Sequence, residues 1–138
     1  MLFLITNLTK GVLMKLNTFL LVKAIICIVF GIGFAVVPTT VGSIYAITPD
    51  PDGLIMTRFF GAAFIGIGLI LWFCRDTDWN TLKGITLSLC IADTVGFLAA
   101  LLGQLSGNVN AAGWVNVALW LVFALGLGYF RFLKPANT

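Results

Sequence analysis

Four long apolar runs dominate this chain, and they constrain its fold more than any other feature. They cover about residues 16–37, 56–73, 84–103 and 112–130. A helix crosses the hydrocarbon core of a bilayer with about 20 residues, so each run is long enough to span a membrane. Polar or helix-breaking residues separate the runs, at 38, 49–53, 75–80 and 104–110. The pattern predicts an all-α membrane protein with four transmembrane helices.

The composition indicates that lipid is the surrounding solvent. Hydrophobic residues make up 60% of the 138 residues and charged residues only 9%, and the mean hydropathy is +1.09. A soluble domain carries roughly 25% charged residues to cover its core. The net charge of +3 comes from basic residues that stand singly, unlike those of a phosphate-binding patch. We therefore expect one membrane domain over 1–138, with the lipid bilayer as its partner and no nucleic acid.

The basic residues predict how the spans are oriented. If the spans cross the membrane alternately, one side carries Lys10, Lys15, Arg75, Lys83, Arg131 and Lys134. The opposite side carries Asp50 and Asp52. Basic residues concentrate in cytoplasmic segments of membrane proteins. We therefore expect both termini in the cytoplasm and an up-down-up-down antiparallel bundle.

The first run also has some features of a secretory signal. Met14 and a basic residue precede a short apolar stretch at 24–37. However, Lys23 interrupts the run, and no A-x-A cleavage site follows before Pro38. Cleavage would also leave three spans and upset the charge asymmetry. We expect the run to be kept as a span, with residues 1–13 forming a short amphipathic lead-in or with Met14 as the true start.

The sequence lacks residues that most catalytic and metal sites need. There is no histidine, which removes the commonest general base and transition-metal ligand. Cys27, Cys74 and Cys90 lie on separate segments without a C-x-x-C motif, so no zinc or thioredoxin-like site is indicated. We expect no catalytic, cofactor-binding or metal site, and an enzyme is the less favoured class.

Small residues at helical spacing predict which helix faces pack. Helices in lipid associate through close van der Waals contact, so small residues mark their interfaces. In the third run, Thr86, Cys90 and Asp93 share a face with small residues, and branched residues occupy the opposite face. The predicted helix-packing positions are Gly31, Gly61, Gly66, Gly68, Gly96, Ala100 and Gly103.

Asp93 is the one acidic residue inside an apolar run, and such residues usually mark a buried ion pair or a working site. At a helical rise of about 1.5 Å per residue, Asp93 lies roughly 15 Å from Lys83 at the cytoplasmic boundary. Lys23 lies roughly 12 Å from Lys15 on a span that runs in the same direction. The two side chains are nearly level, so we expect a Lys23–Asp93 pair if the first and third spans pack closely.

Other partners for Asp93 stay open. Arg58 could pair with it, although Arg58 lies some 12 Å nearer the opposite boundary, where its side chain can reach lipid phosphates. A protonated Asp93 could instead hydrogen-bond to Cys90, to a backbone carbonyl or to Asn116. The candidate intramembrane polar site is therefore Asp93, Lys23, Arg58 and Asn116.

This site has two interpretations. Buried polar groups can fix the register of packed helices, and we favour that role because no chain of polar residues continues on either side of Asp93. The alternative is a functional site, either a proton or cation relay or a polar pocket for a lipid headgroup or a quinone.

The second run also carries a motif. Residues 57–76 read TRFFGAAFIGIGLILWFCRD, which contains R-x-F-G-A-x-x-x-G-x-G-x-x-x-W followed by a basic residue. This resembles a large group of small, uncharacterised prokaryotic four-helix membrane proteins, and the resemblance covers most of 14–133. It implies that fold and a location in the prokaryotic cytoplasmic (inner) membrane. The architecture is more loosely similar to DoxX-like membrane proteins, some linked to quinone-dependent thiosulfate oxidation, but no residue here carries that activity over.

Three functions stay open. The leading hypothesis is a non-enzymatic accessory or scaffold subunit that binds lipid or a larger membrane complex, because the chain has no catalytic motif and no extramembrane domain. The second is a transporter or ion-conducting protein that uses Asp93, which would require self-association because four helices are few for a carrier. The third is a quinone- or lipid-linked enzyme component with Asp93, Lys23 and Arg58 around a pocket.

Overall fold

Every regular element in residues 2–133, the part of the chain that the structure describes, is a helix. The computed structural model contains α1 (Leu2–Val36), α2 (Pro38–Ile44), α3 (Pro51–Cys74), α4 (Trp79–Leu105), α5 (Gly113–Gly128) and a π-helical turn, η1 (Tyr129–Leu133). Four segments are long and apolar enough to cross a membrane: Lys10–Val36, Pro51–Cys74, Trp79–Leu105 and Gly113–Leu133. The predicted fold class, all-α with four candidate membrane spans, is confirmed.

α3 and α4 begin before their apolar runs do, because aspartates cap both helices. The carboxylate of Asp50 accepts a hydrogen bond from the backbone N–H of Gly53 at 2.7 Å, and Pro51 follows it in the first turn. The carboxylate of Asp78 accepts from the backbone N–H of Thr81 at 3.3 Å and from its hydroxyl at 2.9 Å. Such caps satisfy N–H groups that have no partner within the helix, so the helices continue into polar sequence.

The first span and the connection after it contain more helix than the sequence suggested. α1 runs without a break from Leu2, so the segment before residue 14 continues the helix of the first span. α2 then occupies part of the long connection between the first two spans. It ends at Ile44; Ala46, just beyond the helix, has a φ of 58°, and the N–H of Ile47 donates to the carbonyl of Gly42 at 2.9 Å. This is a Schellman ending, in which a left-handed residue turns the chain out of the helix.

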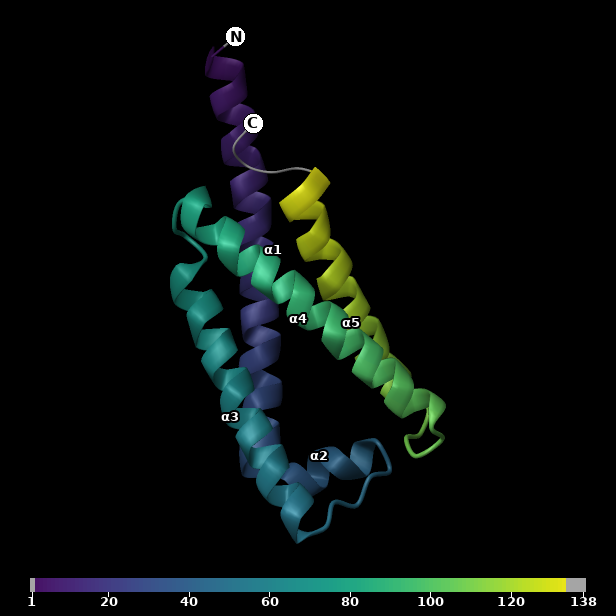
Figure 1. Ribbon diagram of the computed structural model, residues 1–138. Helices are drawn as coiled ribbons and strands as arrows, with labels where there is room; N and C mark the ends of the chain where they lie inside the picture. The colour runs from purple at the N-terminus through teal and green to yellow at the C-terminus, as the bar shows by residue number, and fades with distance from the viewer. Residues whose placement is uncertain (1, 134–138) are drawn as a thin grey trace.

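The four long helices form two antiparallel pairs. α1 lies against α3, and α4 lies against α5 (Figure 1). The start of α1, the α3–α4 turn and η1 lie toward one end of the molecule, here named the terminal end. α2 and the α4–α5 connection lie toward the other, here named the loop end, and the two pairs diverge in that direction (Figure 1). The pairs are therefore closest to each other toward the terminal end.

Glycines bring α1 and α3 into backbone contact. A β-carbon added at Gly31 would lie 2.8 Å from the carbonyl oxygen of Gly61, and one at Gly61 would lie 2.6 Å from the carbonyl oxygen of Gly31. One at Gly68 would lie 2.9 Å from the carbonyl oxygen of Ala24. In the other pair, Gly96 leaves room for the ring of Trp120. These are the close approaches that small residues permit in membrane helices.

Two other predicted packing glycines make no such contact. No heavy atom lies within 4 Å of the place that a β-carbon would take at Gly66 or at Gly103. Spacing along one helix does not say where a neighbouring helix ends or diverges, so a packing role for these two positions stays a prediction. Ala100 and Gly103 instead border an open space between the pairs.

The closest-packed core lies toward the terminal end, and all four long helices contribute to it. Its buried members are Leu16, Leu20, Ala24, Leu71, Trp79, Leu82 and Leu127. Partly buried apolar side chains surround this cluster, among them Phe19, Ile67 and Phe130. In this part of the molecule the four helices behave as one bundle.

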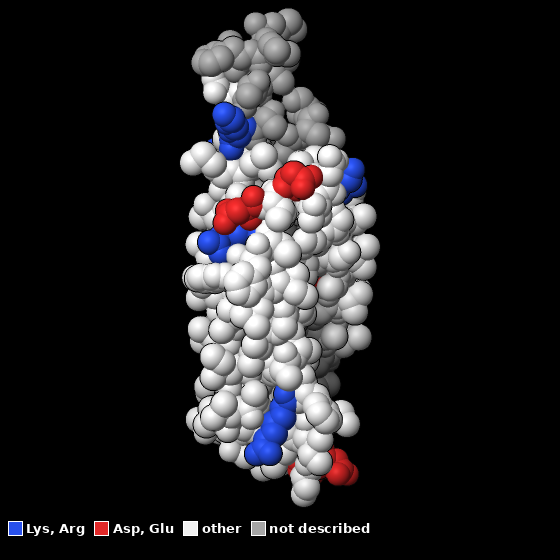
Figure 2. All heavy atoms as spheres, turned by 90° about the vertical axis from the view of Figure 1, so that its left-hand side faces the viewer, with Lys and Arg blue, Asp and Glu red and all other residues white. Residues whose placement is uncertain are grey.

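The outer surface of the bundle is apolar. Large side chains such as Val29, Phe59, Phe73, Val95 and Leu125 are more than half exposed. On the α3 side of the molecule, Figure 2 shows charged side chains near the two ends and a broad, nearly uncharged band between them. Water-soluble proteins rarely expose apolar patches of this extent, so the surface is suited to contact with lipid.

Candidate functional site

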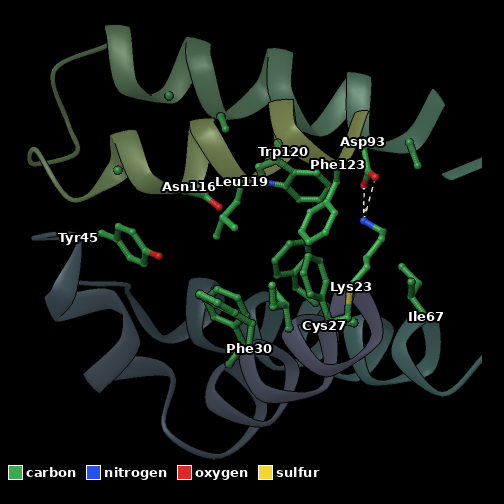
Figure 3. Close-up of a pocket in the computed structure, with 18 of the residues that line it drawn as sticks. Lys23, Cys27, Phe30, Tyr45, Ile67, Asp93, Asn116, Leu119, Trp120 and Phe123 are labelled. Carbon is green, nitrogen blue, oxygen red and sulfur yellow. Dashed lines mark hydrogen bonds and ion pairs between the residues drawn. The ribbon is translucent and has the colours of Figure 1, made fainter. Parts of the chain in front are cut away.

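A buried ion pair joins the two helix pairs. The Nζ atom of Lys23, on α1, lies 2.7 Å from Oδ1 and 2.8 Å from Oδ2 of Asp93, on α4 (Figure 3). Lys23 is 3% exposed and Asp93 is 2% exposed. This is the contact expected from the depths of the two residues in their spans. Both carboxylate oxygens accept from the same ammonium group, so two of its three protons are engaged.

Aromatic rings of α5 surround the rest of the Lys23 ammonium group. Its Nζ lies 4.3 Å from the centroid of the Phe123 ring and 5.9 Å from that of Trp120. A cation over an aromatic face is stabilised, and the effect grows when water is excluded. The ammonium group thus links α1, α4 and α5. Cys90 is not a partner of Asp93; its thiol donates to the carbonyl of Ala124 at 3.5 Å.

A cavity of about 360 Å³ lies between the two helix pairs and extends from this ion pair toward the loop end. Its size is near the lower limit of the roughly 300–1,000 Å³ usual for small-molecule pockets. Six apolar aromatic side chains contribute to its walls: Phe30, Phe34, Phe60, Phe64, Trp120 and Phe123. Several of these rings also pack on one another, with Phe64 meeting Trp120 edge to face at 5.9 Å.

Polar groups line the cavity toward the loop end. They are the phenol of Tyr45 and the amides of Gln104 and Asn116. Figure 3 shows Tyr45 and Asn116 extending toward the space between the helix pairs. Nε2 of Gln104 donates to the carbonyl of Asn110 at 3.2 Å, but its Oε1 atom is buried without a hydrogen-bond partner. Burial raises the pKa of the Tyr45 phenol, so this group stays a neutral hydroxyl at physiological pH.

Hydrogen bonds join the two connections at the loop end of the cavity. The backbone N–H of Asn110 donates to the carbonyl of Tyr45 at 3.2 Å. The side-chain amide of Asn110 donates to the carbonyl of Ile44 at 2.9 Å. Asn110 therefore ties the α4–α5 connection to the end of α2, and both connections contribute lining residues.

On the other side of the ion pair, packed side chains close the cavity. Leu16 and Leu20 of α1 are fully buried there, and Phe19 packs against Phe123 with ring centroids 5.7 Å apart. Thr86 is also fully buried, but its hydroxyl has no partner among the described residues. The cavity thus ends at Lys23–Asp93 and does not continue through the terminal half, the part between this pair and the terminal end.

The structure brings together only part of the predicted polar site. Lys23, Asp93 and Asn116 all line the cavity. Arg58 is exposed, does not line the cavity, and makes no ion pair with any residue in the described range. This placement agrees with the expectation that the Arg58 side chain lies away from Asp93, near the opposite boundary.

Sequence reasoning missed the aromatic walls and the loop-end polar groups. One signal was present: Phe30 and Phe34 stand four residues apart, as do Phe60 and Phe64, and residues so spaced share a helix face. Gln104 and Tyr45 carried no comparable signal, because both lie where apolar runs end and polar residues are expected.

Within residues 2–133, no group of three His, Cys, Asp or Glu side chains lies close enough together to hold a metal ion. Comparison of the chain with models of protein families, with curated proteins and with solved structures gave no match.

Proposed function

We propose that this protein is a small multi-pass membrane protein that binds a lipophilic ligand in the cavity between its two helix pairs, in a non-enzymatic accessory role. The cavity is the observation that carries the proposal. Its aromatic walls suit an apolar ligand, and it is lined by residues from all four long helices and both loop-end connections. Pockets of this kind, mostly apolar with a few convergent polar groups, are typical ligand sites.

The closed terminal half favours ligand binding over conduction. A path for ions or protons would have to pass from Lys23 and Asp93 through the leucine-rich core at Leu16, Leu20 and Leu82. Charged groups crossing such a region lose their hydration without compensation. A transporter that uses Asp93 would therefore need a second conformation in which this half opens.

The proposed orientation follows the charges. Lys15, Arg75 and Lys83 lie toward the terminal end, whereas Asp50 and Asp52 lie toward the loop end. The positive-inside rule then places the terminal end in the cytoplasm and both chain termini with it. In intact cells, we expect an impermeant maleimide to label an Asp52→Cys variant and to spare Lys83→Cys. Labelling of Lys83→Cys alone would reverse the orientation.

Ligand binding is tested by tryptophan quenching. Trp120 lines the cavity, so a dibrominated stearyl alcohol that enters the cavity will quench its fluorescence when the purified protein is titrated in detergent micelles. We expect a saturable component that disappears in a Trp120→Phe variant. Mass spectrometry of the protein purified in mild detergent then identifies any lipid that is retained from the membrane.

Two glycine variants provide a matched pair. Gly103→Leu fills space that borders the cavity, whereas Gly66→Leu adds the same side chain at an equally open position outside it. We expect Gly103→Leu to weaken binding by roughly tenfold or more, because overpacking costs about 1–3 kcal/mol. Gly66→Leu should bind as wild type does. Absence of a saturable Trp120 component, or equal binding by all three proteins, would overturn the proposed function.

A further inference from the structure

We propose that the cavity selects an uncharged lipid whose polar end carries a hydroxyl or another hydrogen-bond donor, bound with that end toward the loop end. The proposal rests on the proposed function and specifies its ligand. Three features of the cavity carry it: the balance of charge along the walls, the free hydrogen-bonding groups near the loop end, and the aromatic walls between them.

The charge balance disfavours ionised ligands. Lys23 and Asp93 are the charged residues that line the cavity, and they neutralise each other at 2.7 Å. A carboxylate, phosphate or ammonium group entering the cavity would bring a net charge without a counter-ion, and such burial is strongly unfavourable. Arg58, the other basic residue of the predicted polar site, lies outside the lining.

The ion pair also leaves few hydrogen-bond donors for an anionic ligand at the Lys23–Asp93 end of the cavity. Asp93 accepts hydrogen bonds from two protons of the Lys23 ammonium group, and the centroid of the Phe123 ring lies 4.3 Å from Nζ. An anion could reach Lys23 only by displacing Asp93, which would leave that carboxylate buried and unpaired. An uncharged ligand has no such requirement.

The polar end of the ligand is assigned by Gln104. The Nε2 atom of this amide already donates to the carbonyls of Asn110 and Val109, whereas its Oε1 atom is buried and unpaired. The free group is therefore an acceptor, and the complementary ligand group is a donor. Leaving a buried acceptor unpaired costs about 1–3 kcal/mol. Oε1 lies against Gly113, so a ligand hydroxyl recovers that free energy once the Gln104 side chain turns toward the cavity that it lines. The amide of Asn116, which also lines the cavity, can accept or donate a second bond.

The apolar body of the ligand then lies along the aromatic walls, with Phe30 and Phe64 on one helix pair and Trp120 on the other. The volume of about 360 Å³ accommodates one chain or one ring system. With the loop end at the membrane surface, this orientation matches that of a lipid in the adjacent leaflet, with its polar end outward.

Competition among four single-chain probes tests the proposal. Oleyl alcohol, oleic acid, oleylamine and cis-9-octadecene share an 18-carbon chain with the same double bond and differ in the polar end, so each is titrated against the bound dibrominated stearyl alcohol. We expect oleyl alcohol to displace it most effectively. The acid and the amine, measured at a pH where both are ionised, and the alkene should each need roughly tenfold higher concentration, since one unpaired buried group has an effect of this order.

Two substitutions separate the hydrogen bond from the charge. Gln104→Leu should abolish the advantage of the alcohol over the alkene and leave the exclusion of the acid intact. Asp93→Asn leaves the Lys23 cation without its counter-ion, so the acid should become a better competitor than the alcohol. The double variant Lys23→Gln with Asp93→Asn restores charge balance and should restore the preference for the alcohol, which keeps the test valid if the single variant does not fold.

The outcomes distinguish the two proposals. If no probe displaces the reporter and Trp120 is not quenched, the proposed function fails. If the probes compete but the acid or the amine equals the alcohol in wild type, the cavity binds lipid and the inferred selectivity is wrong. An unchanged ranking in Gln104→Leu would overturn the assignment of the polar end.

Discussion

The two halves of this molecule are built from the same four helices but are packed in different ways. In the terminal half, Leu16, Leu20, Leu82 and Leu127 are fully buried and belong to one core cluster that joins the helix pairs. In the loop half, between the Lys23–Asp93 pair and the loop end, the pairs diverge and aromatic rings surround a cavity. The same apolar helices therefore form a solid core in one half and line a cavity in the other. The difference depends on which neighbour each side chain meets.

Glycine positions show this difference most clearly. Gly61 and Gly68 face a helix backbone, and Gly66, on the same helix, faces open space. Gly96 accommodates the Trp120 ring, whereas Gly103, two turns farther along α4, borders the cavity. A glycine in a membrane helix thus marks close packing in one place and an opening in another.

The largest expected effect comes from breaking the ion pair at the boundary between the halves. Lys23→Met or Asp93→Leu leaves a buried charge without its partner, which typically costs about 3–5 kcal/mol. The double variant should lose much less, because two apolar side chains replace a neutral pair. Unfolding in mixed micelles with increasing dodecyl sulfate measures all three variants. Additive losses in the double variant would show that the two residues do not act together.

The next largest loss of stability is expected from a substitution at the contact between α1 and α3. A β-carbon at Gly61 would collide with backbone atoms of Gly31 and Ala35, so Gly61→Ala must push the helices apart. Overpacking of this kind costs about 1–3 kcal/mol. Gly66→Ala on the same helix meets nothing within 4 Å and should gain up to about 1 kcal/mol from the higher helix propensity of alanine. Similar unfolding curves for the two variants would contradict the described contact.

A third pair of variants compares the halves directly. Ala24 is fully buried in the close-packed core cluster, next to the ion pair, so Ala24→Leu adds volume where none is free and should cost about 1–3 kcal/mol. Gly103→Leu adds more atoms than Ala24→Leu does, but it adds them beside the cavity. This variant should therefore unfold near the wild-type midpoint. If Gly103→Leu were the more damaging variant, the loop half would be as closely packed as the terminal half.

The smallest expected effect is the dependence of stability on pH that comes from Asp78, at the terminal end. Hydrogen bonds from Thr81, chiefly from its hydroxyl, lower the pKa of Asp78. A carboxyl whose folded pKa lies below its unfolded value of about 3.9 stabilises the fold above that value. This contribution is lost as the pH falls from about 4 through the lower folded pKa. Thermal unfolding between neutral and acidic pH should show the loss in wild type, and Asp78→Asn should remove it. An equal acid dependence in the two proteins would exclude this role for the cap.

The regular features of the chain could be predicted from its sequence, and its irregular ones could not. Four apolar runs predict four spans because a bilayer requires that length of helix, and helical rise alone places Lys23 level with Asp93. Divergence of the helix pairs depends on three-dimensional contacts at Phe64, Trp120 and Asn110, which no single-helix pattern encodes. The same limit explains why Gly103 was assigned to packing and why Gln104 was overlooked.

The ion pair also has a consequence for how the protein is made. Lys23 and Asp93 are 70 residues apart, so the first helix enters the membrane long before its counter-ion is synthesised. An unpaired lysine near the centre of a span costs about 2.5–3.5 kcal/mol on insertion scales. We therefore expect the nascent α1–α3 hairpin to be held by the insertion machinery until α4 arrives, and chains truncated after α3 should be degraded faster than full-length chains in a pulse-chase experiment. Completion of the charge pair then acts as a quality-control signal, because only a chain that has reached its third long helix leaves no uncompensated charge in the lipid.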